Sequence, residues 1–202
     1  RDKETESIFI DIANKNFSEI IFASDYKSKF ENSDIEYLNK NIKTVVQICR
    51  NLNDKKINDT SIEKGILKID LNSDLYGRWT VINERPKTIL DSAHNESGFV
   101  HLSKQLSSLE YDKVFFILSF VKGKNIKKLV SYLPDKSLIY FTSSNMSRSM
   151  NQIEIEESVG ENINFDKNPN RIYRNIFSQA SADDLIIIAG SNYIAKEIFH
   201  EK

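Results

Sequence analysis

Residues 87–99 read KTILDSAHNESGF, an apolar run followed by a polar cluster and the start of a helical pattern. The apolar run stops at Asp91, and His94 and Asn95 follow after Ser92 and Ala93. An acid, an imidazole and an amide at the end of a buried strand have two interpretations. They form either a turn with a helix cap or part of a ligand site, and the spacing alone leaves both open.

Outward from this stretch, strand and helix patterns alternate. Continuous apolar runs, which are typical of strands covered on both faces, lie in residues 113–120, 137–143 and 184–191. Further strands are expected at 79–83 and 88–90, and helices at 96–109, 125–133, 151–160, 171–182 and 192–202. The alternation predicts an α/β fold with a mostly parallel sheet. We expect residues 114–119, 138–142 and 185–189 to be neighbouring parallel strands.

The residues before this region follow other patterns. Residues 34–52 have apolar side chains at helical spacing and predict one amphipathic helix, and residues 62–67 predict a short one. Residues 19–25, EIIFASD, predict a strand, whereas residues 4–15 fit a helix and a strand equally well. Residues 70–77 are polar and indicate a linker.

The composition narrows the class of protein. The chain has 202 residues, 28 of them basic and 29 acidic, and its net charge of −1 does not favour nucleic acid or a membrane surface as a partner. No apolar run approaches the roughly 18 residues of a membrane-spanning helix. The single cysteine, Cys49, lies on the apolar face of its predicted helix and suits a reducing cytoplasm. Because the chain starts at Arg1 rather than at Met, we expect it to be a piece of a longer protein.

Three polar clusters follow predicted strands, at residues 91–95, 121–125 and 190–192. In open α/β sheets ligands bind outside the carboxyl ends of the strands, so each cluster is a candidate site. Each also has a plainer explanation as a turn, a lysine-bearing loop or a helix cap. No phosphate-binding glycine motif occurs in the sequence, and His101 and His200 have no metal-ligand partner at helical spacing.

Several motifs, taken in order, resemble one known family. The segment GRWTVINERPKTILDSAHNESG resembles the G-R and D-G-A-H-N elements of folylpolyglutamate synthases and dihydrofolate synthases, which belong to the Mur ligase superfamily. Upstream, YLNKNIKTVVQICRNL and IEKGIL resemble the elements that precede it. Downstream, VKGKN, FTSSNMSRSM and DDLIIIAGSNYIAKEI resemble the elements that follow. The ordered matches run from about residue 4 to the end of the chain.

This resemblance implies two domains. Residues 1–73 would be the C-terminal end of the central ATP-binding domain. Residues 74–202 would form the Rossmann-like Mur ligase C-terminal domain, the glutamate ligase domain, with its mostly parallel sheet. The family's phosphate loop and its Mg²⁺ ligands would lie in a missing N-terminal half, so the fragment is expected to fold but not to turn over alone. The family also implies a monomer.

The implied reaction is ATP-dependent amide formation. ATP phosphorylates a carboxylate of a folate or of dihydropteroate, and the amino group of L-glutamate then attacks the acyl phosphate. Arg78, in the G-R element, matches the family's nucleotide-contacting arginine and is expected to be catalytic, because a guanidinium is always charged. Asp91 and Asn41 match residues that contact ATP. His94 and Ser191 match positions of the glutamate site, and His94 is also expected to be catalytic. The resemblance therefore favours a ligand site at Asp91 and His94.

The chain departs from the family pattern at a few positions. Ser92 replaces a glycine, Leu38 replaces a glutamine, and Gly123 and Asn125 replace the two acids of a D-K-D segment. Two other functions stay open. One is a cell-wall Mur ligase that adds an amino acid to a nucleotide-linked peptide, and the other is a non-catalytic Rossmann-like binding module.

Overall fold

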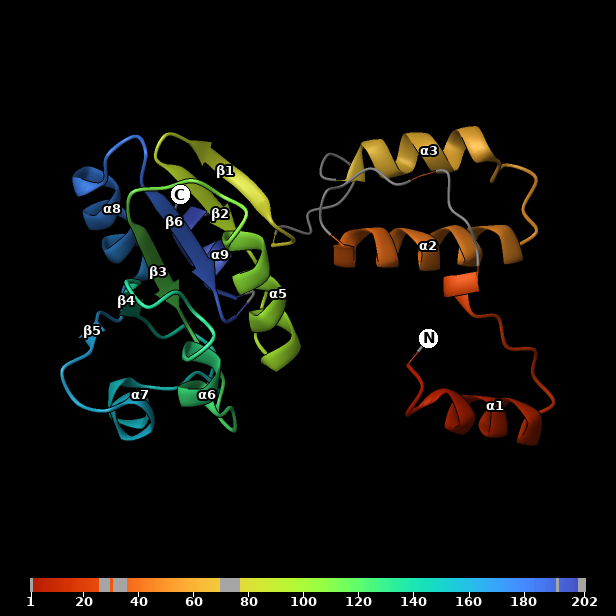
Figure 1. Cartoon of the computed structure of the whole chain (residues 1–202), viewed down its shortest axis with the longest axis horizontal. Coiled ribbons are helices and arrows are strands. Elements are labelled where there is room, and N and C mark those ends of the chain that lie inside the picture. Colours follow the sequence, from red (N-terminus) through yellow and green to blue (C-terminus); the bar gives the residue numbers. More distant parts are fainter. Residues whose placement is uncertain (1, 26–29, 31–35, 70–76, 192, 200–202) are drawn as a thin grey trace. The chain divides into compact units, whose positions relative to one another are not determined.

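The computed structural model describes residues 2–25, 30, 36–69, 77–191 and 193–199 (Figure 1). The chain divides into two units, Arg1–Asp74 and Leu75–Lys202. The predicted linker at residues 70–77 lies outside the described residues except for Gly77. No helix in the described ranges has both the length and the apolar character that crossing a membrane requires.

The described elements of the first unit are helical. They are α1 (Glu6–Lys15), the short 3₁₀ helix η1 (Ala23–Asp25), α2 (Glu36–Asn51) and α3 (Asp59–Leu67). The helix predicted over residues 34–52 is confirmed, and residues 4–15 take the helical alternative. The strand predicted over residues 19–25 is wrong. Ile20 and Ile21 are exposed, and the described part of this unit has no strand with which a β-branched run could pair.

The first unit has a small apolar core between its second and third helices. Phe30, Val46 and Ile62 are buried together, and Cys49 packs against them half-buried, as its place on the apolar face predicted. The short helix predicted at residues 62–67 is confirmed as part of α3, which begins three residues earlier. The earlier start has a local cause, because the Asn58 side chain accepts the N–H of Ser61 in a capping box.

The second unit is built on a six-stranded sheet. Its strands are β1 (Thr80–Glu84), β2 (Lys87–Leu90), β3 (Val114–Leu118), β4 (Leu138–Phe141), β5 (Asn164–Phe165) and β6 (Leu185–Ala189). They follow the order β1-β2-β6-β3-β4-β5, and every pair is parallel except the antiparallel pair β1–β2. The predicted α/β fold and the predicted neighbouring parallel strands β6, β3 and β4 are both confirmed.

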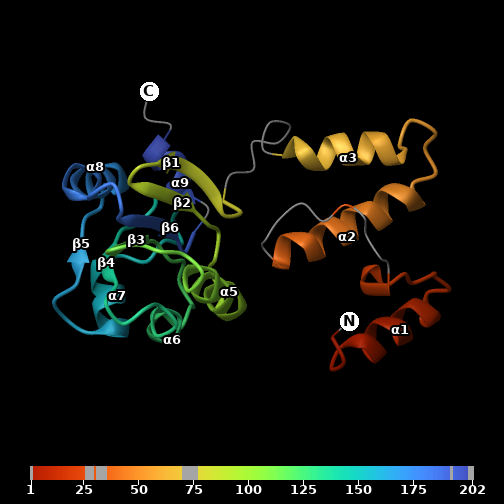
Figure 2. The same cartoon turned by 45° about the horizontal axis from the view of Figure 1, so that its top comes forward.

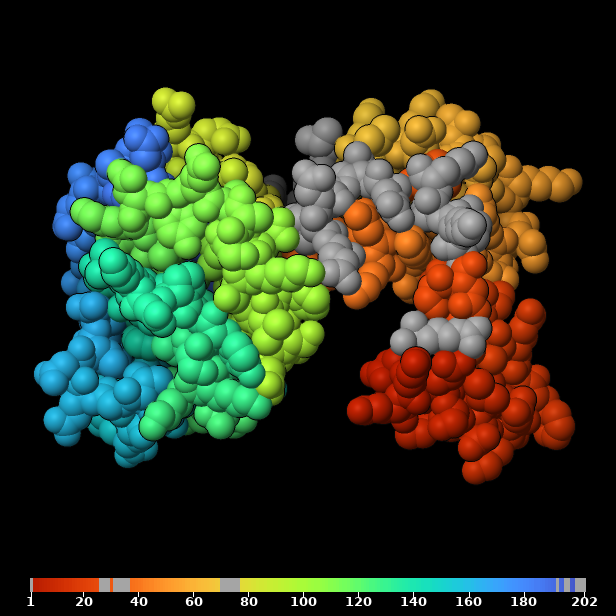
Figure 3. Space-filling model, viewed as in Figure 1, coloured from red at the N-terminus to blue at the C-terminus, as the bar shows by residue number. Residues whose placement is uncertain are grey.

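Helices cover both faces of this sheet. They are α5 (Glu96–Leu106), α6 (Ile126–Val130), α7 (Gln152–Val159), α8 (Pro169–Gln179) and α9 (Tyr193–Phe199). One core joins the sheet to α5, α6 and α7, and the other joins it to α8 and α9 (Figure 2). In the space-filling view, the atoms of the second unit that face the viewer run from yellow-green to teal, the colours of α5, of α6 and of the connections beside them (Figure 3). Every residue of β3 and β6 is buried, which explains their uninterrupted apolar sequences.

The carboxyl ends of four strands meet at one edge of the sheet. Beyond β2, the Asp91 N–H donates to the Ile188 carbonyl at 3.0 Å, and beyond β3 the Ser119 N–H donates to the Ala189 carbonyl at 3.2 Å. Beyond β4, the Thr142 N–H donates to the Leu118 carbonyl at 2.9 Å. We call this the carboxyl edge, and the loops that follow these four strands begin there.

Candidate functional site

Four of the five predicted site residues belong to the second unit. Asp91 and His94 follow β2 and Ser191 follows β6, so these three lie in loops that begin at the carboxyl edge. Arg78 precedes β1, and its segment is bound to the same loop because the Ser92 N–H donates to the Gly77 carbonyl at 2.7 Å. Asn41 lies in the other unit, on α2, where its side chain is exposed.

Asp91 holds the two loops of this site together. Asp91 is buried, with an exposed fraction of 7%, and both oxygens of its carboxylate accept backbone N–H groups. Oδ2 accepts from Trp79 at 3.0 Å, and Oδ1 accepts from Ala93 at 2.8 Å. Trp79 has a positive φ of 57°, which a non-glycine residue adopts only when its surroundings hold it there. The turn interpretation of Asp91 is therefore correct.

Replacing Asp91 with alanine is expected to destabilise the second unit by about 2–4 kcal/mol, because one buried and one partly buried N–H group lose their acceptor. Asp135, which is exposed, gives a matched control, and Asp135→Ala should change the stability little. The measurement is the free energy of unfolding in urea. An Asp91→Ala variant as stable as the wild type would show that the turn does not depend on this carboxylate.

His94 presents one ring nitrogen away from the loop. Its Nδ1 lies 2.8 Å from the Ser92 carbonyl oxygen, and because a carbonyl only accepts, Nδ1 carries the proton. Nε2 is then the acceptor in the neutral ring, on an exposed side chain. Asn95 has a different role. Its Oδ1 accepts the Gly98 N–H at 2.8 Å and so caps α5, which is the plainer interpretation of this residue.

Ser191 is buried, with an exposure of 6%, and follows Gly190 at the end of β6. Its Oγ lies 3.4 Å from the Tyr193 N–H, so the hydrogen bond that it accepts is long and weak. The Gly190 N–H donates to the Ala93 carbonyl at 2.8 Å. That bond places the Ser191 loop beside the loop of Asp91 and His94.

The departures in the D-K-D segment have a structural explanation. Asn125 caps α6, because its Oδ1 accepts the Lys128 N–H at 3.1 Å, and asparagine caps helices about as well as aspartate. Gly123 has a φ of 84°, which suits glycine in the preceding turn. Lys124 between them is half-buried. The second acid of the segment can therefore be lost without losing the cap.

Among the described residues, one carboxylate in a loop of the carboxyl edge and two in the first turns of the helices after these loops are engaged. Asp91 accepts two N–H groups, Glu96 binds Lys128, and Glu154 binds Lys122 at 2.7 Å. For Arg78, Lys124 and Arg148, by contrast, the described residues offer no carboxylate partner. Cations that have no carboxylate partner in the described part of the chain make this edge of the sheet suitable for an anionic ligand.

Glu96 links two of these loops. Its carboxylate, in the first turn of α5, accepts hydrogen bonds from Lys128 Nζ at 2.8 Å and from the Tyr132 hydroxyl at 2.5 Å, both on the α6 side. These two hydrogen bonds, of which the one from Lys128 has the larger effect, lower the pKa of Glu96 from its ordinary 4.5. The same contact raises the pKa of Lys128 and the pKa of Tyr132.

This contact predicts a pH dependence. A carboxyl whose pKa is lowered by folding contributes stability above its unfolded pKa and loses it as the pH falls through the folded value. The wild type should therefore be slightly more stable than Glu96→Gln at pH 7, and the two should converge well below pH 4.5. The effect is small because the groups are exposed. Urea unfolding at several pH values measures it, and a constant difference down to the lowest pH would contradict the prediction.

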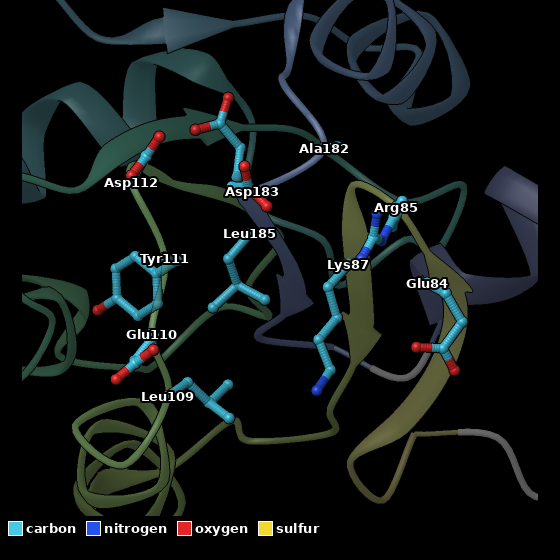
Figure 4. A pocket seen from close by; sticks show the side chains of 11 residues that line it. Glu84, Arg85, Lys87, Leu109, Glu110, Tyr111, Asp112, Ala182, Asp183 and Leu185 are labelled. Atoms are coloured by element: carbon cyan, nitrogen blue, oxygen red, sulfur yellow. The ribbon is translucent and has the colours of Figure 1, made fainter.

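A cavity of about 480 Å³ lies at the opposite end of the sheet, where β2, β3 and β6 begin. None of the five predicted site residues lines it. Figure 4 shows Glu110, Tyr111 and Asp112 on one side of this cavity and Arg85 and Lys87 on the other. Because ligands of open α/β sheets bind at the carboxyl ends of the strands, we assign the candidate site to the carboxyl edge and not to this cavity.

Comparisons with known proteins identify the family of the second unit. The profile of the family described as Mur ligase, glutamate ligase domain, matches residues 77–192. A dihydrofolate synthase/folylpolyglutamate synthase of Buchnera aphidicola subsp. Baizongia pistaciae is 32% identical over 120 residues, which are 58% of this chain and 28% of that protein. The enzyme of the same name from Bacillus subtilis is 24% identical over 145 residues, which are 70% and 33% of the two chains. The chain thus spans about a third of the length of these curated relatives.

Solved structures of related enzymes share the fold. A bifunctional folylpolyglutamate synthase/dihydrofolate synthase from Yersinia pestis, complexed with AMPPNP and Mn ion, aligns with 95% of this chain and 50% of its own, at a TM-score of 0.73 and 17% identity. A bifunctional folylpolyglutamate synthase/dihydrofolate synthase with Mn, AMPPNP and L-glutamate bound aligns with 86% of this chain and 42% of its own, at a TM-score of 0.65 and 18% identity.

Proposed function

The chain belongs to the Mur ligase family, whose glutamate ligase domain it contains, and we propose that it is part of an ATP-dependent ligase that adds L-glutamate to a folate or dihydropteroate carboxylate through an acyl phosphate. The names of its relatives and the AMPPNP and L-glutamate of the neighbouring structures support this choice of substrates. They favour a folate enzyme over the cell-wall ligase that the sequence left open.

One observation of this structure carries the proposal. Arg78 lies in the segment bound to the loop of Asp91, and Lys124 and Arg148 lie in the loops that follow β3 and β4. None of the three has a carboxylate partner among the described residues, while Asp91, Glu96 and Glu154 are engaged. Formation of an acyl phosphate passes through states in which negative charge spreads over phosphoryl oxygens, and fixed cations stabilise that charge. We assign this role to Arg78, which is catalytic and contacts ATP in the proposal.

The remaining site residues divide between the two substrates. We assign Asp91 to the nucleotide, because a carboxylate accepts hydrogen bonds from hydroxyl groups. Asn41, an exposed amide with both a donor and an acceptor, contacts ATP from the first unit. His94 and Ser191 bind the glutamate, and we assign to Nε2 of His94, the nitrogen that does not bind the Ser92 carbonyl, the role of accepting a proton from the ammonium group.

We further propose that the first unit is the end of the central ATP-binding domain. The sequence contains no glycine-rich phosphate loop, and the described residues hold no group of three acidic, histidine or cysteine side chains that could bind a metal. They do not fit a Mg²⁺ site, so we derive no step through the metal. The chain alone is then expected to be inactive. Its cytoplasmic location and monomeric state stay predictions.

Amide chemical shifts test where the substrates bind. Adding ADP or L-glutamate to the labelled chain should shift the amides of residues 91–94 and 190–191 and leave those of residues 109–112, at the opposite cavity, in place. Shifts confined to the amides of residues 109–112 would place the binding site at the opposite end of the sheet and contradict the proposal. No shift at saturating concentrations of both compounds would favour a non-catalytic module with another ligand.

A further inference from the structure

Two serine hydroxyls at the carboxyl edge are buried without a hydrogen-bond partner. Ser119 is 0% exposed and Ser144 is 7% exposed, and Oγ of each has no donor or acceptor among the described residues. Neighbouring hydroxyls are bonded, since Ser143 Oγ donates to the Met150 carbonyl at 2.6 Å and Ser149 Oγ accepts the Ser144 N–H at 2.9 Å. Native proteins leave few buried polar groups unpaired, so each exception calls for an explanation.

Ser119 lies at the centre of the carboxyl edge. It follows β3, the strand between β6 and β4 in the sheet. Its backbone touches that of Gly190, where a side-chain carbon would meet the Ser119 carbonyl oxygen. Strand alternation places its hydroxyl on the face of Phe115 and Ile117, which α8 and α9 cover. Ser119 is therefore one backbone contact away from the loop of Ser191.

Ser144 lies in the loop that follows the neighbouring strand, β4. The next residue, Asn145, donates its N–H to Glu197 Oε1 of α9 at 2.8 Å. This bond joins the loop to the helix that begins just after Ser191. The two unpaired hydroxyls therefore belong to adjacent strand ends, and both are connected through α9 or Gly190 to the proposed glutamate-binding loop.

We propose that Ser119 and Ser144 extend the amino-acid site, and that their hydroxyls donate hydrogen bonds to a carboxylate of the incoming amino acid. A carboxylate is the favoured ligand group because a hydroxyl can donate to it and because the acids of these loops are already engaged. This inference rests on the proposed glutamate ligase function and adds two specificity-determining residues to it.

The inference predicts opposite effects on stability and on binding. Removing an unpaired buried hydroxyl relieves its desolvation cost, so Ser119→Ala and Ser144→Ala should each raise the thermal midpoint by about 2–6 °C. Each should also weaken binding of L-glutamate by about 3- to 10-fold, the effect of one lost hydrogen bond. Ser143→Ala is the matched control, because its hydroxyl is already bonded. It should lower the midpoint and leave the affinity unchanged.

The experiment measures thermal unfolding and titration with L-glutamate for the 202-residue chain, the three serine variants and His94→Ala. Suppose that the wild type binds L-glutamate, that His94→Ala weakens this binding, and that Ser119→Ala and Ser144→Ala bind normally. The inference is then wrong and the proposed function stands. A lower thermal midpoint in both Ser119→Ala and Ser144→Ala would also overturn the inference, because their hydroxyls would then have partners. If saturating L-glutamate shifts no amide of residues 91–94 or 190–191 in the wild type, the glutamate assignment fails together with the inference.

Discussion

Replacing Gly190 with alanine is expected to destabilise the second unit by about 3–5 kcal/mol, from a strained backbone and an overpacked contact together. Gly190 has a φ of 95°, which side chains other than hydrogen rarely allow. An added Cβ would lie 2.3 Å from the Ser119 carbonyl oxygen and 3.1 Å from the Ser119 nitrogen. Both atoms belong to the backbone directly after the central strand β3, where the Ser119 N–H donates to the Ala189 carbonyl of β6, so they cannot move away without disturbing that pairing.

Two other glycines separate the strain from the contact. Gly160 also has a positive φ, 101°, but a Cβ there meets nothing within 4 Å, so Gly160→Ala should cost only the backbone strain, about 1–2 kcal/mol. Gly65, in α3, has neither feature, and Gly65→Ala should be neutral or slightly stabilising. The measurement is urea unfolding of all three variants. Equal losses for Gly190→Ala and Gly160→Ala would show that the strand ends do not approach as described.

Replacing Arg78 with alanine is expected to lower the rate of glutamate ligation by about 10²–10³-fold, or roughly 2.7–4 kcal/mol of barrier. The reason is that the variant lacks a fixed cation that stabilises the negative charge developing on the phosphoryl oxygens. The assay requires a phosphate loop, so we place the variant in a joined ligase, in which this chain follows the nucleotide-binding part of the Bacillus subtilis relative. The fold should persist, because Arg78 is exposed and the described residues offer its side chain only a long contact of 3.5 Å with the Gly77 carbonyl.

Arg85 provides the matched control for this variant. Arg85 is also an exposed arginine and lies between β1 and β2, but it lines the cavity at the opposite end of the sheet. Arg85→Ala should therefore ligate at the wild-type rate. If the two variants lose activity equally, or if Arg78→Ala is as active as the wild type, the assignment of Arg78 to the phosphates is wrong.

The sequence predicted the second unit well because its strands are buried on both faces. Runs such as VFFIL and LIIIA leave little alternative to a central parallel strand, and they became β3 and β6. The two-residue β5 was missed because a pattern needs more residues to show a period. The strand predicted over residues 19–25 failed because local propensity cannot provide the partner strands that a β-run needs.

The site was predicted in part. The sequence indicated Asp91 and His94 by their position after a strand, and the structure adds that Asp91 also supports the positive φ of Trp79. Asn95 proved to be a cap. No sequence signal distinguishes Ser119 from the other serines, because its lack of a partner is a property of three strand ends that meet in space.

The most direct test of the account is incorporation of radiolabelled L-glutamate into dihydropteroate or a reduced folate by the joined ligase. The account predicts a product one glutamyl residue longer, formed only with ATP, L-glutamate and the folate substrate present. The chain without the nucleotide-binding part should form none. Product from the chain alone, or no product from a joined ligase that folds and binds both ATP and L-glutamate, would contradict the proposed function.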